Sequence, residues 1–370
     1  MEWNPTLCHS RDEDAPSPGR DAMATRASFG MCSCRARQTR GRLWAFLLAG
    51  MLLVAALGQT PSNAAGVLTW KHGIIAPKGD AGFELMALTK NFYARYGVSV
   101  EFVDFVGNVQ VNQALIAHEI DSAEEGADPV LAAVLKGVDL KIIGSTIPGN
   151  PFALYARSGI TEFTQLAGKT IGVSAPGALP DILLRAMVKA KGVDPKSLVL
   201  VNAGSDAERY QAVKAGKVDA MAGSSEFVPM AQQDGVNVLG FAKEIVPLYP
   251  RFFIVANGKS LREKPEAAIG FLAGEMEGLS YALVHRDEAL ALTARTIRVP
   301  PNNSRLTYLY DDLKNAHMVS PTLAIPRDKI AWLQNFRIEL GLQKERVNLD
   351  TLVDDSFRQK ALGVAKNVLR

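Results

Sequence analysis

The sequence is short of cysteine, and the few cysteines it has are badly placed for chemistry. There are three in 370 residues, Cys8, Cys32 and Cys34, and all precede residue 43. The rest of the chain therefore has no thiol nucleophile, no disulfide framework and no cysteine ligand for a metal. The four histidines after residue 64 lie far apart, without the close spacing of a metal-ligand pair. We expect no bound metal, no cofactor and no catalytic residues.

An excess of charge of one sign is also missing. The chain has 41 Lys and Arg against 38 Asp and Glu, a net charge of +3, whereas binding to nucleic acid needs a concentrated basic face. A composition of 48% hydrophobic and 21% charged residues is that of a globular protein long enough for two separate cores. We therefore expect no nucleic-acid partner.

The long apolar run of the chain lies near its N-terminus. Four arginines precede LWAFLLAGMLLVAALG, residues 43–58, and small residues follow at Ser62, Ala64 and Ala65. A basic region, about 15 apolar residues and a small-residue site form a secretory signal peptide, while a membrane-spanning helix needs about 20 apolar residues. The pattern predicts that residues 1–64 are a leader and signal peptide, cleaved near Ala64 or Ala65. No cysteine follows to carry a lipid anchor.

Strands and helices alternate from residue 67 to about residue 241, which indicates parallel sheets flanked by helices. The pattern occurs twice, because QALIAHEIDSA at 113–123 aligns with QAVKAGKVDAM at 211–221 at a constant offset of 98. Asp121 and Asp219 occupy equivalent positions, which predicts a structural role for both. We expect an α/β protein with two lobes of the same topology. Helical patterns then follow at 264–296, as one long helix or two, and at 303–320, 326–342 and 351–369, and we expect these helices to pack on the first lobe.

The tripeptide Gly168-Lys169-Thr170 has the letters that close a phosphate-binding loop. Such a loop follows a strand and opens a helix, but this tripeptide precedes the strand TIGVSA. The order of elements therefore argues against a nucleotide site. The turn after that strand, SAPGALPD, has small residues and Pro180 at the start of a helix, where free backbone N–H groups can hold an anion. An ordinary tight turn is the alternative.

An equivalent turn, APKGDAG at 76–82, lies between a strand and a helix of the first lobe. Ligands of open α/β sheets bind outside the carboxyl ends of the strands. Two such lobes therefore predict a ligand cleft between the two turns. Lys71, Lys78 and Arg251 are candidates to meet an anion there, and a solvated position is the alternative for each.

Three stretches of the chain resemble the periplasmic substrate-binding proteins of nitrate-, sulfonate- and taurine-type ABC importers, which include binders of thiamine-precursor pyrimidines. They are ALIAHEIDSAEEGADPVL, LAGKTIGVSAPGALPDILLRAMVKAKGVDP and AVKAGKVDAMAGSSEFVP, and the resemblance covers residues 66 to about 345. It implies a type II-like two-lobe α/β fold. Residues 66–157 and 250–370 would form lobe one and residues 158–249 lobe two, with hinges at 156–160 and 246–252.

The resemblance also implies a function. A monomeric, non-enzymatic periplasmic protein would capture a small organic solute, such as a sulfonate, taurine, a nitrate-like anion or a pyrimidine, and deliver it to an ABC permease and its ATPase. Carried over by position, the ligand-binding residues fall at the strand ends of both lobes. In lobe one they are Pro77, Lys78, Gly79, Asp80, Gly107, Asn108, Glu125 and Gly126, and in lobe two Ser174, Ala175, Gly177, Ala178, Asn202, Ser224 and Ser225.

Two stretches depart from the family pattern. Many relatives have an aromatic-Thr-Gly run where this chain has EEG at 124–126, and others have Trp-Asp-Pro where it has SSE at 224–226. A carboxylate in the cleft repels an anion and leaves room for a neutral or amine-bearing ligand. Since side chains alternate along a strand, at most one of Glu124 and Glu125 faces the cleft. For Glu125 a solvated strand end is an equal alternative.

Two other functions fit the same fold. A ligand-sensing module that reports to a membrane receptor would have the same sequence features. A pyrimidine-precursor enzyme of this lineage would use a cysteine-rich motif and histidine, and no cysteine follows residue 34.

Overall fold

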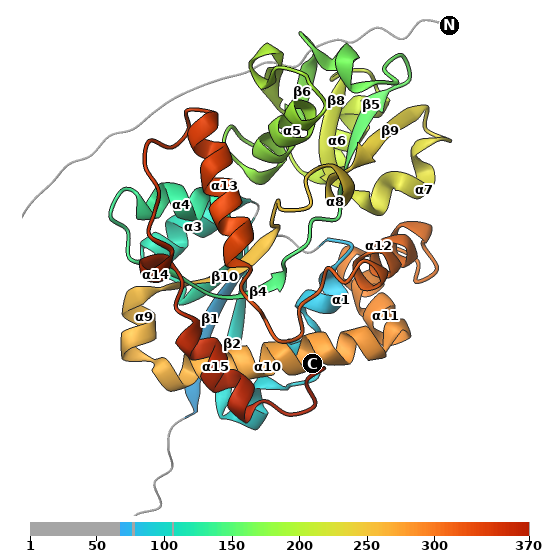
Figure 1. Ribbon diagram of the computed structural model, residues 1–370. Helices are drawn as coiled ribbons and strands as arrows, with labels where there is room; N and C mark the ends of the chain where they lie inside the picture. Colours follow the sequence, from blue (N-terminus) through green and yellow to red (C-terminus); the bar gives the residue numbers. More distant parts are fainter. Residues whose placement is uncertain (1–66, 76–77, 106, 370) are drawn as a thin grey trace, which may run out of the picture. The chain divides into compact units, whose positions relative to one another are not determined.

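A computed structural model describes residues 67–75, 78–105 and 107–369 of the protein (Figure 1). The expected signal peptide and Pro77 lie outside the described residues. The chain forms two five-stranded sheets, with strand orders β2-β1-β3-β10-β4 and β7-β6-β8-β5-β9. In each sheet a single strand, β10 or β5, runs antiparallel to its two neighbours. The expected α/β fold with two lobes of mostly parallel strands is confirmed.

The strands and helices of each lobe follow one another closely in sequence. The first sheet consists of β1 Leu68–Ile75, β2 Val98–Phe105, β3 Ser122–Glu125, β4 Leu140–Ile147 and β10 Phe252–Asn257. The second consists of β5 Phe152–Arg157, β6 Thr170–Val173, β7 Val199–Asn202, β8 Ala220–Ser224 and β9 Val236–Phe241. The helices that connect the strands include α1 Ala81–Glu84, α2 Met86–Thr89, α3 Asn108–Ile116, α4 Ala127–Val134, α5 Leu179–Ala190, α6 Asp206–Lys214, α7 Val228–Ala231 and α8 Ala242–Ile245.

One aspartate anchors the central strands of each lobe in the same way. Asp121 Oδ2 accepts a hydrogen bond from Lys71 N, and Asp219 Oδ2 accepts one from Thr170 N, each at 2.9 Å. The backbone carbonyl of each aspartate accepts a further bond of 3.0 Å from the last residue of the antiparallel strand, β10 or β5. The two halves thus repeat the same contacts, and the predicted structural role of both aspartates is confirmed.

The expected lobe boundary at residue 157 is wrong. The strand β5 pairs with β8 and β9 in the second sheet, so the chain first crosses between the lobes at residues 148–151 rather than at 156–160. It returns between β9 and β10, over residues 242–251, which includes α8. The hydrophobic run FALYAR of β5 does not reveal its lobe, because a fully buried strand fits the middle of either sheet equally well.

The segment 81–96 is broken into α1, α2 and a 3₁₀ turn at Tyr93–Tyr96. Asn91, between α2 and this turn, has a left-handed backbone with φ 55°. The breaks allow Phe83, Met86 and Phe92 to be buried together, because the segment wraps around α10 Pro265–Val284 and α11 Arg286–Ile297. Burial of these side chains overrides the local helical preference.

The C-terminal helices pack mainly on the first lobe. The helix α10 lies against β1 and β2 (Figure 1), and it also contacts α15 Asp355–Val364. By length and composition alone α10 could cross a membrane, but most of its residues are buried inside the protein, as in the core helix of a globular domain. Two further helices are α12 Ser304–Asn315 and α13 Arg327–Glu339. They contact the second lobe as well as the first, whereas the sequence predicted packing on the first lobe.

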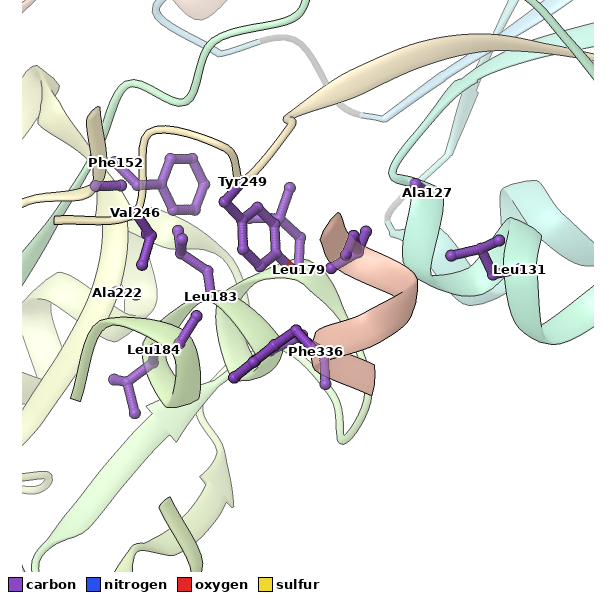
Figure 2. Close-up of a cluster of buried hydrophobic side chains, with 14 of the residues drawn as sticks. Ala127, Leu131, Phe152, Leu179, Leu183, Leu184, Ala222, Val246, Tyr249 and Phe336 are labelled. Atoms are coloured by element: carbon purple, nitrogen blue, oxygen red, sulfur yellow. The ribbon is translucent and has the colours of Figure 1, made fainter. Parts of the chain in front are cut away.

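The helix α13 contributes to an apolar cluster that contains residues from both lobes (Figure 2). Phe336 on α13, Leu183 on α5 and Leu131 on α4 belong to it, together with Tyr249 in the second crossing. Within the cluster Asp128 on α4 accepts hydrogen bonds from Tyr249 Oη at 2.7 Å and from an Arg337 guanidinium nitrogen at 2.8 Å. The lobes are therefore joined by apolar packing as well as by the two crossings, while the buried Asp128–Arg337 ion pair holds α13 on α4.

Two helical glycines make a matched test of the packing of α10 against α2. A Cβ built on Gly278 of α10 would lie 2.7 Å from the backbone nitrogen of Ala87, while one built on Gly363 of α15 meets nothing within 4 Å. We expect Gly278→Ala to destabilise the protein by about 1–3 kcal/mol, because overpacking forces the backbones apart. We expect Gly363→Ala to leave stability unchanged or to raise it by up to about 1 kcal/mol. Urea unfolding measures both, and equal effects would contradict the close approach of α10 and α2.

Candidate functional site

Charged side chains from both lobes gather beyond the carboxyl ends of the parallel strands, where the sequence predicts the ligand. Each one alters the ionisation of its neighbours, so they form a connected set. We call this set the charge cluster; it consists of the carboxyl groups of Asp80, Glu84, Glu124, Asp206 and Glu226 and the cationic groups of Lys78, Arg209, Arg251 and Arg305.

Arg251 occupies the first-lobe part of the charge cluster, at the end of the second crossing. Its side chain is 1% exposed, and one guanidinium nitrogen lies 2.5 Å from Asp80 Oδ2. The guanidinium also lies over the Phe252 ring, 4.5 Å from its centre. Burial opposes the charge, but Asp80 and Glu124 outweigh it and raise the pKa of Arg251. The crossing thus brings a permanent cation into the site.

Two carboxyl groups, Glu84 on α1 and Glu124 on β3, lie together behind Asp80. Burial, and then the neighbouring Glu124 and Asp80, raise the pKa of Glu84 well above its ordinary value. Burial also raises the pKa of Glu124, although Thr146 donates a hydrogen bond to it. Like charges this close oppose each other's ionisation, so the pair holds protons more readily than two separate glutamates would.

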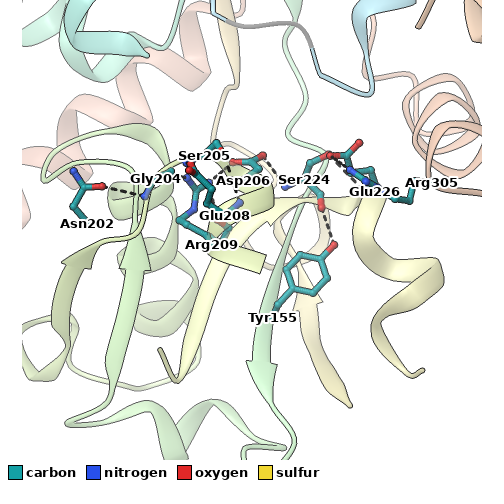
Figure 3. A network of polar contacts seen from close by, with 11 residues as sticks. Tyr155, Asn202, Gly204, Ser205, Asp206, Glu208, Arg209, Ser224, Glu226 and Arg305 are labelled. Atoms are coloured by element: carbon teal, nitrogen blue, oxygen red, sulfur yellow. Dashed lines mark hydrogen bonds and ion pairs between the residues drawn. The ribbon is translucent and has the colours of Figure 1, made fainter. Parts of the chain in front are cut away.

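The second-lobe part of the charge cluster begins at α6 (Figure 3). Asp206, in the first turn, forms an ion pair with Arg209 and accepts a hydrogen bond of 3.2 Å from Ser224 N. Burial opposes ionisation of Asp206, but Arg209 and Lys78 outweigh it and hold its pKa below the ordinary value. Asp206 is therefore ionised at neutral pH.

Glu226 connects the two lobes. It follows β8 of the second lobe, and its Oε1 lies 3.0 Å from a guanidinium nitrogen of Arg305 on α12 (Figure 3). Its Oε2 is buried and has no hydrogen-bond partner among the described residues. A Cβ built on Gly79 of the first lobe would clash with this oxygen. Gly79 thus lets the 78–80 turn approach Glu226.

A second contact between the lobes lies next to Glu226. Ser225 Oγ donates a hydrogen bond of 2.8 Å to Asp312 on α12, and Lys243 of the second crossing forms an ion pair with the same carboxylate. The side chain of Asp312 is 7% exposed. These polar contacts join α12 to the end of β8, where a ligand held between the lobes would lie.

The structure brings together some of the residues expected from the sequence. Lys78 and Asp80 belong to the charge cluster, Gly79 and Ser224 contact its members, and Ser225 lies beside it. Gly107 and Gly126 precede α3 and α4, and Asn108 begins α3. Asn202 is exposed, and its side chain accepts a hydrogen bond of 3.1 Å from Gly204 N in the turn after β7.

The expectation for the two glutamates of β3 needs correction. Glu125 is fully buried, so the alternative of a solvated strand end is wrong. The member of the pair that joins Asp80 and Arg251 is Glu124, whereas the sequence interpretation favoured Glu125. One sequence cannot reveal which of two adjacent strand positions joins the other charged side chains.

The turn expected to hold an anion already contains a carboxylate. Gly177 N, just before α5, donates a hydrogen bond of 2.8 Å to Asp181 Oδ2, and Asp181 in turn pairs with Arg185 at 2.6 Å. Ser174, Ala175 and Ala178 belong to the same turn. The free N–H that the sequence offered to an anionic ligand is thus satisfied within the protein.

The site residues expected from the sequence omit six members of the charge cluster: Glu84, Glu124, Asp206, Arg209, Glu226 and Arg305. Glu124 and Glu226 stand out in the sequence only as departures from the family pattern, while Glu84 ends the short helix α1 and Asp206 begins α6. Arg305 gives no local signal, because it comes from a helix that is distant in sequence. In the described part of the chain no group of three potential metal ligands is arranged to hold an ion.

Comparison with known proteins places this geometry in a family. The model of the family described as NMT1/THI5 like matches residues 80–289, more than half of the chain. The chain belongs to this family. A protein of Bacillus subtilis (strain 168) named for binding aliphatic sulfonates is 24% identical to this NMT1/THI5-like protein over 278 residues, which are 73% of this chain and 80% of the relative.

Solved structures share the fold. The aliphatic sulphonate binding protein SsuA of Escherichia coli superimposes with a TM-score of 0.62 at 21% identity, over 76% of this chain and 91% of that one. The nitrate-binding protein NrtA of Synechocystis PCC 6803 superimposes with a TM-score of 0.67 at 16% identity, over 80% and 89%. At these identities the likeness establishes the two-lobe periplasmic-binding-protein fold.

Behind the charge cluster, Glu275 of α10 makes stability depend on pH. It accepts a hydrogen bond from Tyr93 Oη, and burial raises its pKa to about 8. The pKa of Glu275 is higher in the folded protein than in the unfolded chain. The contribution of neutral Glu275 to the free energy of unfolding is therefore fully present below about pH 4 and is lost as pH rises toward 8. We expect Glu275→Gln, which cannot ionise, to be more stable than the wild type by on the order of 3 kcal/mol at pH 7 and equal to it near pH 4.

Urea unfolding at both pH values checks this expectation. Glu266→Gln is the control, because Glu266 is exposed at the start of the same helix, and it should change stability by less than about 0.5 kcal/mol at either pH. A Glu275→Gln protein without a gain at pH 7 would show that Glu275 is not buried in a neutral form.

Proposed function

We propose that this protein is the extracytoplasmic solute-binding component of an ABC importer. It captures a small organic solute between its two lobes and presents the closed form to a membrane permease with its ATPase. The observation that carries the proposal is the meeting of the two lobes at their strand ends, where Glu226 approaches Gly79 and pairs with Arg305. The relatives named for sulfonate and nitrate binding support the same role.

The proposed role needs no covalent step. Backbone donors, a few polar side chains and the exclusion of water on closure provide the binding energy. The signal peptide would place a cleaved, unanchored monomer in the periplasm. The solutes to consider are sulfonates, taurine, nitrate-like anions and pyrimidines. The residues proposed to face the solute are those of the turns at 78–80 and 174–178, together with Ser224 and Ser225.

Closure can be tested through adjacent aspartates of α12. Asp312 bonds to Ser225 and Lys243 across the lobes, whereas Asp311 pairs with Arg286 of the first lobe at 2.8 Å. We expect Asp312→Asn to weaken solute affinity about tenfold or more, because hydrogen bonds to a charged group are worth about 1.5–3 kcal/mol. Asp311→Asn should leave affinity unchanged.

Affinity is measured by thermal shift and calorimetry with a panel of sulfonates, nitrate, amines and amino acids. The unliganded melting temperature of each variant separates a loss of folding from a loss of closure. If Asp311→Asn and Asp312→Asn weaken binding equally, the contact between the lobes does not control capture. A wild-type protein that chemically converts a bound compound would refute the binding-protein role.

A further inference from the structure

The charge cluster has more carboxyl groups than cations. Five carboxyl groups face four cationic groups, and three of the cations already have ion-pair partners: Arg251 with Asp80, Arg209 with Asp206, and Arg305 with Glu226. The fourth, Lys78, lies over the Phe252 ring, 5.5 Å from its centre. The two glutamates therefore share their cations with other carboxyl groups: Glu84 shares Lys78 with Asp206, and Glu124 shares Arg251 with Asp80.

Glu226 provides a second and independent sign of a missing partner. Its side chain is 5% exposed, and Oε1 is bound by Arg305, but Oε2 has no hydrogen-bond partner among the described residues. This oxygen points to the 78–80 turn, because it lies where the Cβ of a larger residue at Gly79 would be. A buried acceptor without a donor is costly. A donor brought by the ligand would satisfy it.

We propose that the captured solute carries a cationic nitrogen, held by Glu226 of the second lobe and by Asp80 and Glu124 of the first. This inference rests on the proposed solute-binding function and names the class of solute. The nitrogen supplies the donor that Glu226 Oε2 lacks and a further positive charge beside Asp80 and Glu124. Arg251 Nε also has no hydrogen-bond partner among the described residues, and it offers a donor to an acceptor group of the same solute.

Binding of a cation at this place is coupled to release of a proton. Glu84 faces Glu124, Asp80 and Lys78, while Glu124 faces Asp80, Arg251 and Thr146. Behind them Glu275 and Tyr93 add a carboxyl and a phenol. The raised pKa values of the pair favour its protonated form in the unliganded protein, and an approaching cation favours its ionised form. Affinity for a cationic solute therefore rises with pH, whereas an anionic solute would be bound more tightly as pH falls.

The test uses pairs of compounds in which one member carries one or two amino groups and the other carries none. The pairs are taurine and ethanesulfonate, β-alanine and propionate, and butane-1,4-diamine and butane-1,4-diol, each at about 10 mM in a thermal-shift assay of the protein without its signal peptide. We expect at least one amine to raise the melting temperature and to bind about tenfold or more tightly than its partner. Calorimetry in two buffers of different ionisation enthalpy should show proton release on binding of that amine.

Two variants link the result to the charge cluster. Glu226→Gln and Glu124→Gln keep the shape of the side chain and should weaken amine binding about tenfold or more, and Glu124→Gln should also reduce proton release. Glu119→Gln, at an exposed carboxylate after α3, is the control and should change neither. The unliganded melting temperature confirms that each variant is folded.

The outcomes separate this inference from the proposed function. If ethanesulfonate or propionate binds as tightly as its amine partner, or with proton uptake, the cationic class is wrong and the solute-binding function stands. If amine binding survives Glu226→Gln and Glu124→Gln unchanged, the assignment of the carboxylates is overturned. If no compound of any charge binds, both proposals fail together.

Discussion

The burial of Arg251 is the constraint on which the site depends. A guanidinium taken out of water must be matched by nearby carboxylates, because an unpaired buried charge costs several kcal/mol. Asp80 and Glu124 come from the first lobe and Asp206 from the second. Arg251 itself lies where the chain returns from one lobe to the other. The need to balance one cation therefore ties the turn after β1, the end of β3, the start of α6 and the second crossing to the same point.

The aspartate anchors explain why these parts can meet. Asp121 and Asp219 fix the first and third strands of each parallel set in the same register, so the strands of both lobes end at comparable places. Polar residues that follow those strands then lie at one edge of each sheet. Because each lobe contains one copy of this strand arrangement, the protein has two such edges. A ligand site between them needs no further helix or strand. Function in this fold lies in the residues placed at the edges rather than in the fold itself.

Two kinds of contact join the lobes, and they differ in how easily water can replace them. The cluster around Phe336 and Tyr249 is apolar and contains the buried Asp128–Arg337 ion pair, so its loss would expose apolar surface and an unsatisfied charge. The contacts of Asp312 with Ser225 and Lys243 are polar, and water can substitute for each of them. The contacts of Asp312 therefore cost less to break than the apolar cluster.

The sequence alone determined the α/β class, the duplicated topology and the edge where polar residues gather, because these follow from local periodicity and from an internal repeat. It could not assign β5 to its lobe, since a strand that is buried along all but its last residue, Arg157, fits the centre of either sheet. It did not identify Glu124 over Glu125 or connect Arg305 with Glu226, which lie 79 positions apart in the chain. Only the tertiary structure decided the composition of the charge cluster, because electrostatic balance depends on distances in space, and these are set by packing between distant segments.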